Sequence, residues 1–332
     1  MRIRTAILGC GQFAHRHAQI LSGMKDEVEL VAFCDRQESR AREYAEQYTE
    51  GKGSIFTDQH ALFEEAQFDL VMICLPPFAH TDEVELAAER GIHLLIEKPI
   101  ALSSAQGWKM VEAAEKAGIK TQVGFMFRFG EAVEQLKAWI DSGEAGPLGL
   151  MSARYFCNSL HTPWWRDRSK SGGQLLEQVI HMFDLLRYLG GEVESVYSRQ
   201  ENIFHRKQTD YTIEDVSATV VNFRNGGLGV VYATNGAIPG KWINDYRVVT
   251  EKITADFKDA NHASFYMTAE EGAPQIQIDS ERDFRQKQIE DLLQAIRTDG
   301  QTRTPIREGA KTLDLVLAAT ESAVSHQEVI LR

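Results

Sequence analysis

Two glycines near the start of the chain have the spacing that binds the phosphates of a dinucleotide. The pattern G-x-G-x-x-G/A is met by Gly9-Cys10-Gly11-Gln12-Phe13-Ala14, between a short apolar run and an amphipathic stretch. The glycines let the backbone approach a pyrophosphate, and a helix that opens at Gln12, Phe13 and Ala14 offers free N–H groups to it. We therefore predict a cofactor-binding loop here rather than a plain tight turn.

The residues at the end of the second apolar run indicate which dinucleotide is bound. Asp35 ends this run and Arg36 follows it. A carboxylate at this place accepts hydrogen bonds from the adenosine ribose of NAD and repels the 2′-phosphate of NADP. Asp35 could also cap the helix that we expect from residue 37, and Arg36 could stack on adenine or bind a phosphate. The pair favours NAD, with NADP as the less favoured cofactor.

Pro76 and His80 follow a third apolar run, over residues 70–76. If this run is a parallel strand, both residues lie at its carboxyl end, where open α/β proteins bind their ligands. We expect them beside the cofactor. For His80, an ordinary residue in the first turn of a helix is the alternative.

The triplet Glu97-Lys98-Pro99 ends a further apolar run, over residues 93–97. Beside the positive charge of oxidised nicotinamide, a lysine favours its neutral amine form. A neutral amine can take the proton of an alcohol as hydride leaves, so Lys98 is a candidate acid and base. A surface lysine in a strand-to-helix loop is the alternative. Glu97 could orient Lys98 or contact the nicotinamide ribose.

A carboxylate and an imidazole lie one helical turn apart in the second half of the chain. Glu177 and His181 are four residues apart in an expected helix over residues 174–189, and Asp184 can share their face. Such a pair suits proton relay and the binding of vicinal hydroxyls. The alternatives are a zinc site, for which we find no third ligand cluster, and an amphipathic helix with His181 in the core. We expect no metal.

Aromatic and basic residues before this helix could form the wall of a pocket. Trp164, Trp165 and Arg166 combine ring faces that stack on sugar C–H groups with a donor for hydroxyls. The alternative is that one tryptophan is core and the charges are solvated. Arg128 and Tyr155 would add contacts to the substrate, whereas the histidines of the first helix are expected to be surface or packing residues.

The elements that position these residues change character near residue 125. Before it, short apolar runs alternate with amphipathic stretches, which predicts βαβ units and a parallel sheet. After it, longer strand-like segments follow one another, with an Asn225-Gly226 hairpin signal between two of them. The fold class is therefore α/β: a Rossmann domain over residues 1–124, and an α/β domain with a large, mostly antiparallel open sheet over residues 125–332. The strands expected in the second part are 148–157, 193–199, 216–224, 227–234, 246–255 and 264–268.

Composition narrows the possible partners and the compartment. The net charge of −12 argues against nucleic acid and against an anionic membrane surface as partners. The first apolar run is too short for a secretory signal, and no stretch has the length of a membrane span. The four cysteines are scattered without a Cys-x-x-Cys pair, so we expect a reducing, cytoplasmic location.

Taken together, these residues resemble the glucose-fructose oxidoreductase / inositol dehydrogenase family, often called Gfo/Idh/MocA. The resemblance spans essentially the whole chain, and the Glu-Lys-Pro triplet is its most specific part. It is carried by the glycine loop, Pro76 with His80, Glu97-Lys98-Pro99, Gly124 with Arg128, Gly172-Gly173, and His181 with Asp184.

The resemblance implies an enzyme that oxidises or reduces a ring carbinol of a sugar, inositol or related polyol, with Lys98 as the catalytic residue. It also implies a homodimer or homotetramer formed through the C-terminal sheet. Many members carry Asp and Gly where this chain has Glu177 and Val179, which leaves the identity of the substrate open. A cofactor-binding regulator without chemistry and an NAD-dependent glycosidase are the alternative functions, and the presence of both Lys98 and His181 argues against the regulator.

Overall fold

The computed structural model describes residues 2–331, which form two compact units. The first unit runs up to Gly124 and also includes Arg285–Ala310, and the second comprises Phe125–Phe284 and Lys311 onward. The sequence analysis drew a single boundary after residue 124. Residues 285–310 join the first unit because the buried side chains of Ile289, Leu292 and Leu293 pack in its hydrophobic core.

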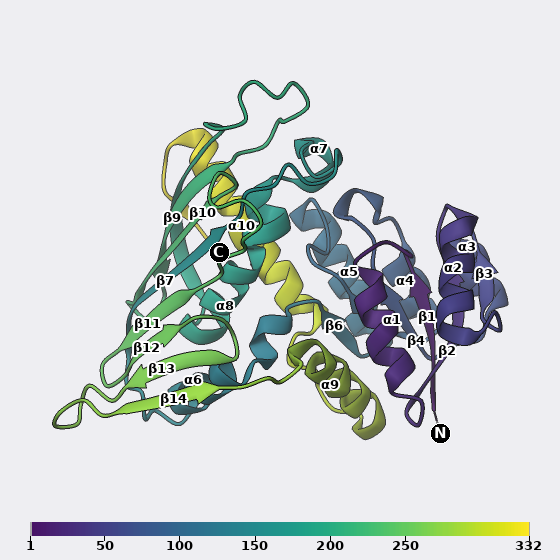
Figure 1. The fold of residues 1–332 in the computed structure, drawn as a ribbon, viewed down its shortest axis with the longest axis horizontal. Helices are drawn as coiled ribbons and strands as arrows, with labels where there is room; N and C mark the ends of the chain where they lie inside the picture. Colours follow the sequence, from purple (N-terminus) through teal and green to yellow (C-terminus); the bar gives the residue numbers. More distant parts are fainter. Residues whose placement is uncertain (1, 332) are drawn as a thin grey trace. The chain divides into compact units, whose positions relative to one another are not determined.

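The first unit is built on a six-stranded parallel sheet (Figure 1). The strand order β3-β2-β1-β4-β5-β6 is that of a Rossmann fold, as the sequence analysis predicted. The direction of the chain along the sheet reverses between β1 and β4, so the loops after these two strands flank the crevice where such folds bind ligands. The strands are β1 (Ile3–Leu8), β2 (Val28–Cys34), β3 (Ser54–Phe56), β4 (Leu70–Ile73), β5 (His93–Ile96) and β6 (Thr121–Val123).

Burial on both faces explains the composition of these strands. Every residue of β4 is buried, and so is every residue of β5 after His93. Helices on both sides of a parallel sheet exclude water from both faces, which favours unbroken apolar runs. The helices of this unit are α1 (Ala14–Gly23), α2 (Glu38–Thr49), α3 (Gln59–Glu65), η1 (Pro77–Ala79), α4 (Glu83–Glu89), α5 (Ser104–Ala117) and α9 (Phe284–Thr298).

The second unit contains a nine-stranded sheet, in the order β14-β13-β12-β11-β7-β10-β9-β8-β15. All neighbouring strands are antiparallel except β7 and β10, which confirms the large, mostly antiparallel sheet. Asn225 and Gly226 form the predicted hairpin turn between β9 and β10, with φ of 90° at Gly226. The strands are β7 (Leu148–Phe156), β8 (Val193–Glu201), β9 (Val216–Phe223), β10 (Leu228–Thr234), β11 (Tyr246–Thr250), β12 (Thr254–Phe257), β13 (His262–Tyr266), β14 (Gln275–Asp279) and β15 (Val329–Ile330).

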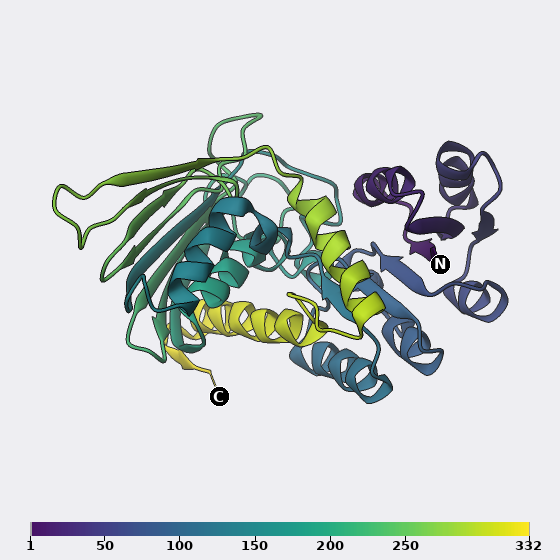
Figure 2. The same ribbon diagram turned by 90° about the horizontal axis from the view of Figure 1, so that it is seen from below.

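Helices cover one face of this sheet, as the ribbon of Figure 2 shows for α6 and α8. The side chains of β9 and β10 accordingly alternate between buried and exposed. The helices of this unit are η2 (Met126–Phe129), α6 (Glu131–Asp141), α7 (Arg168–Ser171), the π-helix η3 (Leu175–Val179), α8 (Ile180–Gly190) and α10 (Ile306–Ser325). Within residues 2–331, none of the helices has the length and apolar character needed to cross a membrane.

Three expected elements differ from the structure. The strand over residues 246–255 is two strands, because a turn after Thr250 reverses the chain. The helix whose first turn could have contained His80 is the short η1 followed by α4, which leaves His80 in an extended conformation between them. The helix over residues 174–189 begins as the π-helix η3, so the regular α-helical spacing that we assumed there does not hold before Ile180.

Candidate active site

The glycine loop after β1 fits a bound dinucleotide. Gly9 has φ of 91°, and a Cβ at this position would lie 2.6 Å from the carbonyl oxygen of Cys74. A Cβ at Gly11, in contrast, would meet no atom within 4 Å, so the backbone there is open to a ligand. Because α1 begins at Ala14, the positive end of its helix dipole lies directly after this loop. The loop therefore offers the tight turn and the favourable electrostatic environment that a pyrophosphate requires.

Asp35 holds two segments of the chain together at the end of β2. Its Oδ2 accepts a hydrogen bond from the backbone N of Cys10 at 3.0 Å, and its Oδ1 accepts one from the backbone N of Gln37 at 2.8 Å. The carboxylate thus lies beside the glycine loop, as a ribose-binding role requires, and also supports the start of α2. Arg36, the next residue, is exposed.

The triplet at the end of β5 is anchored by a histidine from α1. The side chains of Glu97 and His17 are both buried, and Glu97 Oε1 lies 2.6 Å from His17 Nε2. Gly124 gives this glutamate its room, because a Cβ there would lie 2.5 Å from Glu97 Oε2. The backbone N of Lys98 donates to the same Oε2 at 3.3 Å, and the residue is half-buried. We expected His17 to be a packing residue; its place one helical turn after Ala14 was the only sequence signal for this contact.

His80 belongs to a second buried histidine–glutamate pair. Its Nδ1 lies 2.5 Å from Glu83 Oε1, and both side chains are inaccessible to solvent. Burial by itself raises the pKa of Glu83, but hydrogen bonds from His80 and from the backbone of Thr81, with the charge of His80, hold it below its usual value. The imidazole of His80 therefore contacts a protein side chain, and this contact stabilises the loop that follows Pro76. Its contribution to cofactor binding stays a prediction.

His181 is buried between two phenylalanines at the start of α8. Its ring centroid lies 6.3 Å from that of Phe125 and 5.0 Å from that of Phe127. One turn earlier, the half-buried Glu177 accepts a hydrogen bond from Nε1 of Trp165 at 2.7 Å. The structure thus links the helix to the tryptophan loop, which the sequence analysis expected in one pocket.

Trp164, Arg166 and Tyr155, the other expected substrate contacts of this unit, lie in different surroundings. Trp164 is partly buried against the cluster of Trp165, Tyr211 and Ile213. Arg166 forms an ion pair with Asp210 at 2.8 Å. Tyr155 is buried, and burial together with the nearby charges of Cys157 and Glu177 raises its pKa far above the usual range. Its hydroxyl is therefore protonated and can donate a hydrogen bond.

Arg128 occupies a structural position in this unit. Its Nε and Nη2 donate to the two carboxylate oxygens of Asp184 at 2.9 and 2.6 Å, and both side chains are buried. The guanidinium also lies 4.7 Å from the centre of the Tyr188 ring. A buried bidentate pair fixes α8 relative to η2, so Arg128 orients the helix that carries His181. These contacts give Arg128 a positioning role, and the expected contact of Arg128 with the substrate stays a prediction.

No group of three or more His, Cys, Asp or Glu side chains within residues 2–331 is arranged to hold a metal ion. The expected roles of Glu177 and His181 in binding hydroxyls and moving a proton stay predictions. A cavity beside Phe127 was not predicted from the sequence, because the residues that form it come from separate segments without a shared motif.

Comparison with known proteins places the geometry in a family. Residues 3–125 match the profile described as an oxidoreductase family with an NAD-binding Rossmann fold, and residues 133–256 match the Gfo/Idh/MocA C-terminal domain. The scyllo-inositol 2-dehydrogenase (NAD(+)) of Bacillus subtilis is 31% identical over 252 residues, covering 75% of this chain and 72% of that protein. The chain belongs to the Gfo/Idh/MocA family. It is an oxidoreductase with an NAD-binding domain.

Further comparisons agree with this assignment. The myo-inositol 2-dehydrogenase of Thermotoga maritima is 30% identical over 239 residues, covering 72% of this chain and 70% of that protein. The solved structure of a levoglucosan dehydrogenase in complex with NADH and levoglucosan covers 99% of this chain and 99% of its own, with a TM-score of 0.91. At 19% sequence identity, that structure shows a shared fold.

Proposed function

We propose that this chain is an NAD-dependent dehydrogenase that transfers a hydride between a ring carbinol of a sugar, inositol or related polyol and nicotinamide. The observation that carries the proposal is the anchored triplet: Lys98 follows a buried glutamate at the carboxyl end of β5 in an NAD-binding domain. The inositol dehydrogenases that are 30% and 31% identical over the matched residues support the substrate class.

The residues of the first unit fit the cofactor. Gly9, Gly11 and the N-terminus of α1 would bind the pyrophosphate, and Asp35 the adenosine ribose. Asp35 supports NAD over NADP, because its carboxylate repels a 2′-phosphate. Bound NAD supplies the acceptor for the hydride, and the chemistry left to the protein is to move one proton and to hold the substrate.

Three side chains are assigned to that chemistry. Lys98 takes the proton of the reacting hydroxyl during oxidation and returns it during reduction. His181 relays this proton, since an imidazole can donate or accept near neutral pH. Glu177 holds a neighbouring hydroxyl through its carboxylate, while Trp165 fixes the position of that carboxylate. In this proposal residues 1–124 bind the dinucleotide, and residues 125–332 bind the substrate and the partner subunit.

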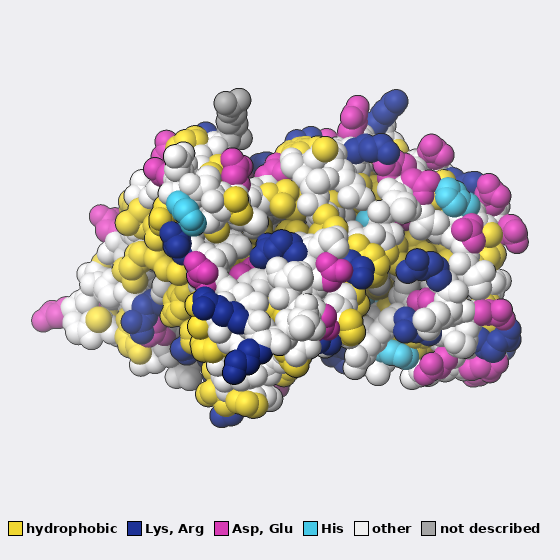
Figure 3. Space-filling model, turned by 90° about the horizontal axis from the view of Figure 1, so that it is seen from above, with side chains coloured by type: hydrophobic (Ala, Val, Ile, Leu, Met, Phe, Trp, Pro, Cys, Tyr) yellow, Lys and Arg dark blue, Asp and Glu magenta, His cyan; other side chains and the backbone are white. Residues whose placement is uncertain are grey.

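The open face of the second sheet supports self-association as a homodimer or homotetramer. Leu150, Val220, Leu228 and Tyr232 are exposed there and lie on neighbouring strands. Figure 3 shows hydrophobic side chains gathered among Lys and Arg side chains on the surface of this unit, at the left of the view. Contiguous exposed apolar side chains of this kind mark protein interfaces. The four unbridged cysteines support a cytoplasmic location.

A panel of neutral polyols and aldoses tests the function. The purified chain is incubated with each compound and with NAD or NADP, and the absorbance of the reduced nicotinamide is followed. At least one ring polyol is expected to reduce NAD, and NAD is expected to be the better cofactor. Glycoside cleavage without added NAD would instead identify a glycosidase, and sugar binding without any redox turnover would identify a regulator.

A further inference from the structure

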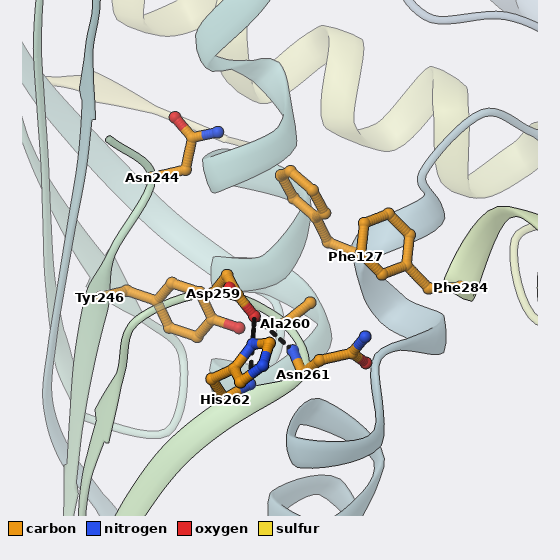
Figure 4. Close-up of a pocket in the computed structure, with 8 residues that line it drawn as sticks. All are labelled: Phe127, Asn244, Tyr246, Asp259, Ala260, Asn261, His262 and Phe284. Carbon is orange, nitrogen blue, oxygen red and sulfur yellow. Dashed lines mark hydrogen bonds and ion pairs between the residues drawn. The ribbon is translucent and has the colours of Figure 1, made fainter. Parts of the chain in front are cut away.

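The second unit contains a cavity of about 250 Å³ whose residues have no role in the account so far (Figure 4). Its walls come from η2, β11, the segments before β11 and β13, and the start of α9. The residues that matter here are Phe127, Asn244, Tyr246, Asp259, His262 and Phe284. The volume lies just below the usual range for small-molecule pockets, so it suits a single ring.

Two residues that line the cavity each have a buried polar atom without a hydrogen-bond partner within residues 2–331: the hydroxyl of Tyr246 and Oδ1 of Asn244. Tyr246 is only 5% exposed, and Figure 4 shows its hydroxyl directed toward the loop that carries Asp259 and His262. Burial raises the pKa of Tyr246 well above its usual range, so the group is a protonated donor. A buried donor and a buried acceptor without partners are suited to the hydroxyl groups of a ligand.

A fixed carboxylate forms another side of the cavity. Asp259 Oδ1 accepts hydrogen bonds from the backbone N of Asn261 and of His262, and it lies 2.7 Å from Nδ1 of His262. Nε2 of the same histidine lies 2.9 Å from Asp279 Oδ1. The histidine is thus held between two carboxylates, and no Lys or Arg of the described chain lines the cavity. Carboxylates without a Lys or Arg beside them disfavour the binding of an anionic ligand. A neutral ligand with hydroxyl groups meets no such repulsion.

Aromatic rings form the remaining wall and connect the cavity to His181. The rings of Phe127 and Phe284 meet edge to face, with centroids 5.8 Å apart. Phe127 also lies 5.0 Å from the ring of His181, so one side chain contacts both the cavity and the proposed proton relay. Apolar ring faces beside polar donors and acceptors match the C–H and O–H groups of a saturated ring.

We propose that this cavity is a substrate subsite for a neutral, hydroxyl-bearing ring and that it selects neutral over acidic sugars. The inference rests on the proposed function, because it assigns the ring to the substrate of the same enzyme. It goes beyond that function by naming residues outside the family motifs and by stating the charge class of the substrate.

Direct binding tests the subsite without turnover. Titration calorimetry on the full chain without added cofactor compares D-glucose with D-glucuronate, which share a ring and differ in a carboxylate. We expect glucose to bind and glucuronate to bind at least tenfold more weakly. Tyr246→Phe keeps the ring stacked on Phe257 at 4.4 Å and removes one hydrogen bond, so glucose should bind roughly threefold to tenfold more weakly. Asp259→Asn should reduce the difference in affinity between glucose and glucuronate.

Tyr266→Phe is the matched control, because Tyr266 lies on β13 and does not line the cavity. Unchanged glucose affinity in both Tyr246→Phe and Asn244→Ala overturns the proposal, and so does undetectable glucose binding or equal binding of glucuronate. If no polyol is oxidised while Tyr246-dependent binding persists, the dehydrogenase function fails and the subsite stands. If a polyol is oxidised and Tyr246→Phe changes neither its turnover nor its binding, the dehydrogenase function stands and the subsite fails.

Discussion

The two units hold their polar site residues in different ways. In the first unit, His17 with Glu97 and His80 with Glu83 form closely spaced buried pairs beside the turns that follow short parallel strands. In the second unit, Glu177 is only half-buried and is held by Trp165 from a loop. In the cofactor half these side chains thus lie in fully buried pairs, whereas in the substrate half the carboxylate of Glu177 is partly exposed and is held by a tryptophan twelve positions earlier.

This difference indicates how the chemistry and the specificity are divided. The dinucleotide is the same molecule in all enzymes that use it, so its site can be built from a common set of loops of a Rossmann sheet. Substrates vary among relatives, and their contacts come from loops that can change without altering the sheet. Replacements in the first unit should therefore affect catalysis and folding, while replacements in the second should change affinity and selectivity.

The largest effect is expected at Lys98. Lys98→Met removes the proposed acid and base while keeping a side chain of similar length, so kcat should fall roughly 10²–10⁴-fold. NAD affinity, measured by fluorescence titration, should stay close to that of the wild type. Lys52→Met, which replaces an exposed lysine of the same unit, is the control. Near-native kcat in Lys98→Met would remove the triplet from the mechanism.

His181 and Glu177 should separate proton movement from substrate placement. His181→Ala is expected to lower kcat on the order of 10²-fold, because the relay is lost. Glu177→Gln keeps the shape and should mainly raise KM, and the double variant should show less than the sum of both effects. Melting temperatures are measured on the same preparations. A lower melting temperature of Glu177→Gln with an unchanged KM would show that Glu177 stabilises the helix and does not position the substrate.

The pair of His17 and Glu97 tests how far the first unit depends on its buried contacts. His17→Ala leaves the carboxylate of Glu97 buried without its partner, which should cost about 1–3 kcal/mol in the free energy of unfolding. Denaturant unfolding measures this loss. His60→Ala removes an exposed histidine of the same unit and should change stability much less. An equal loss in the free energy of unfolding for His17→Ala and His60→Ala would show that the buried pair contributes no more to stability than an exposed histidine.

Cofactor choice should depend on Asp35. Asp35→Ser removes the charge that opposes a 2′-phosphate, so the preference for NAD over NADP should fall by roughly tenfold. Affinities for both cofactors are titrated with wild type and variant. Tighter binding of NADP than NAD by the wild type would mean that Arg36 dominates at this position.

The smallest effect is a pH dependence in the second unit. Burial lowers the pKa of His161, against the opposing influence of Glu177. A histidine whose pKa is lower in the folded protein stabilises it fully above the unfolded value of about 6.5, and this contribution is lost as pH falls through the folded pKa. When the pH is lowered from about 7 to about 5, the melting temperature of His161→Asn should therefore fall less than that of the wild type. Asn tolerates the positive φ of 51° at this position.

The sequence was most informative where structure is local. The glycine loop, the end of β2 and the triplet after β5 each lie within one strand-to-helix connection, so residue order alone predicted the Rossmann sheet. The buried partner of Glu97 was not predictable, because His17 lies 80 positions earlier and contacts it only through the tertiary fold.

The second unit shows more clearly which features could not be predicted from the sequence. Its mostly antiparallel sheet followed from the spacing of its strands and from the Asn225-Gly226 turn. Tyr246, Asn244 and Asp259 belong to no motif, and their shared cavity depends on how loops from different strands pack. The π-helix before His181 was also missed, because its wider hydrogen bonding leaves no mark in the apolar periodicity.

The most direct test of the central claim follows the hydride itself. A polyol that turns over in the panel is prepared with deuterium on each ring carbinol carbon in turn, and the reduced nicotinamide is analysed by mass spectrometry. Our account predicts that one labelled position transfers a single deuterium to NAD, and that Lys98→Met abolishes this transfer. Reduced nicotinamide without deuterium from any ring position, or product without net reduction of NAD, would contradict it.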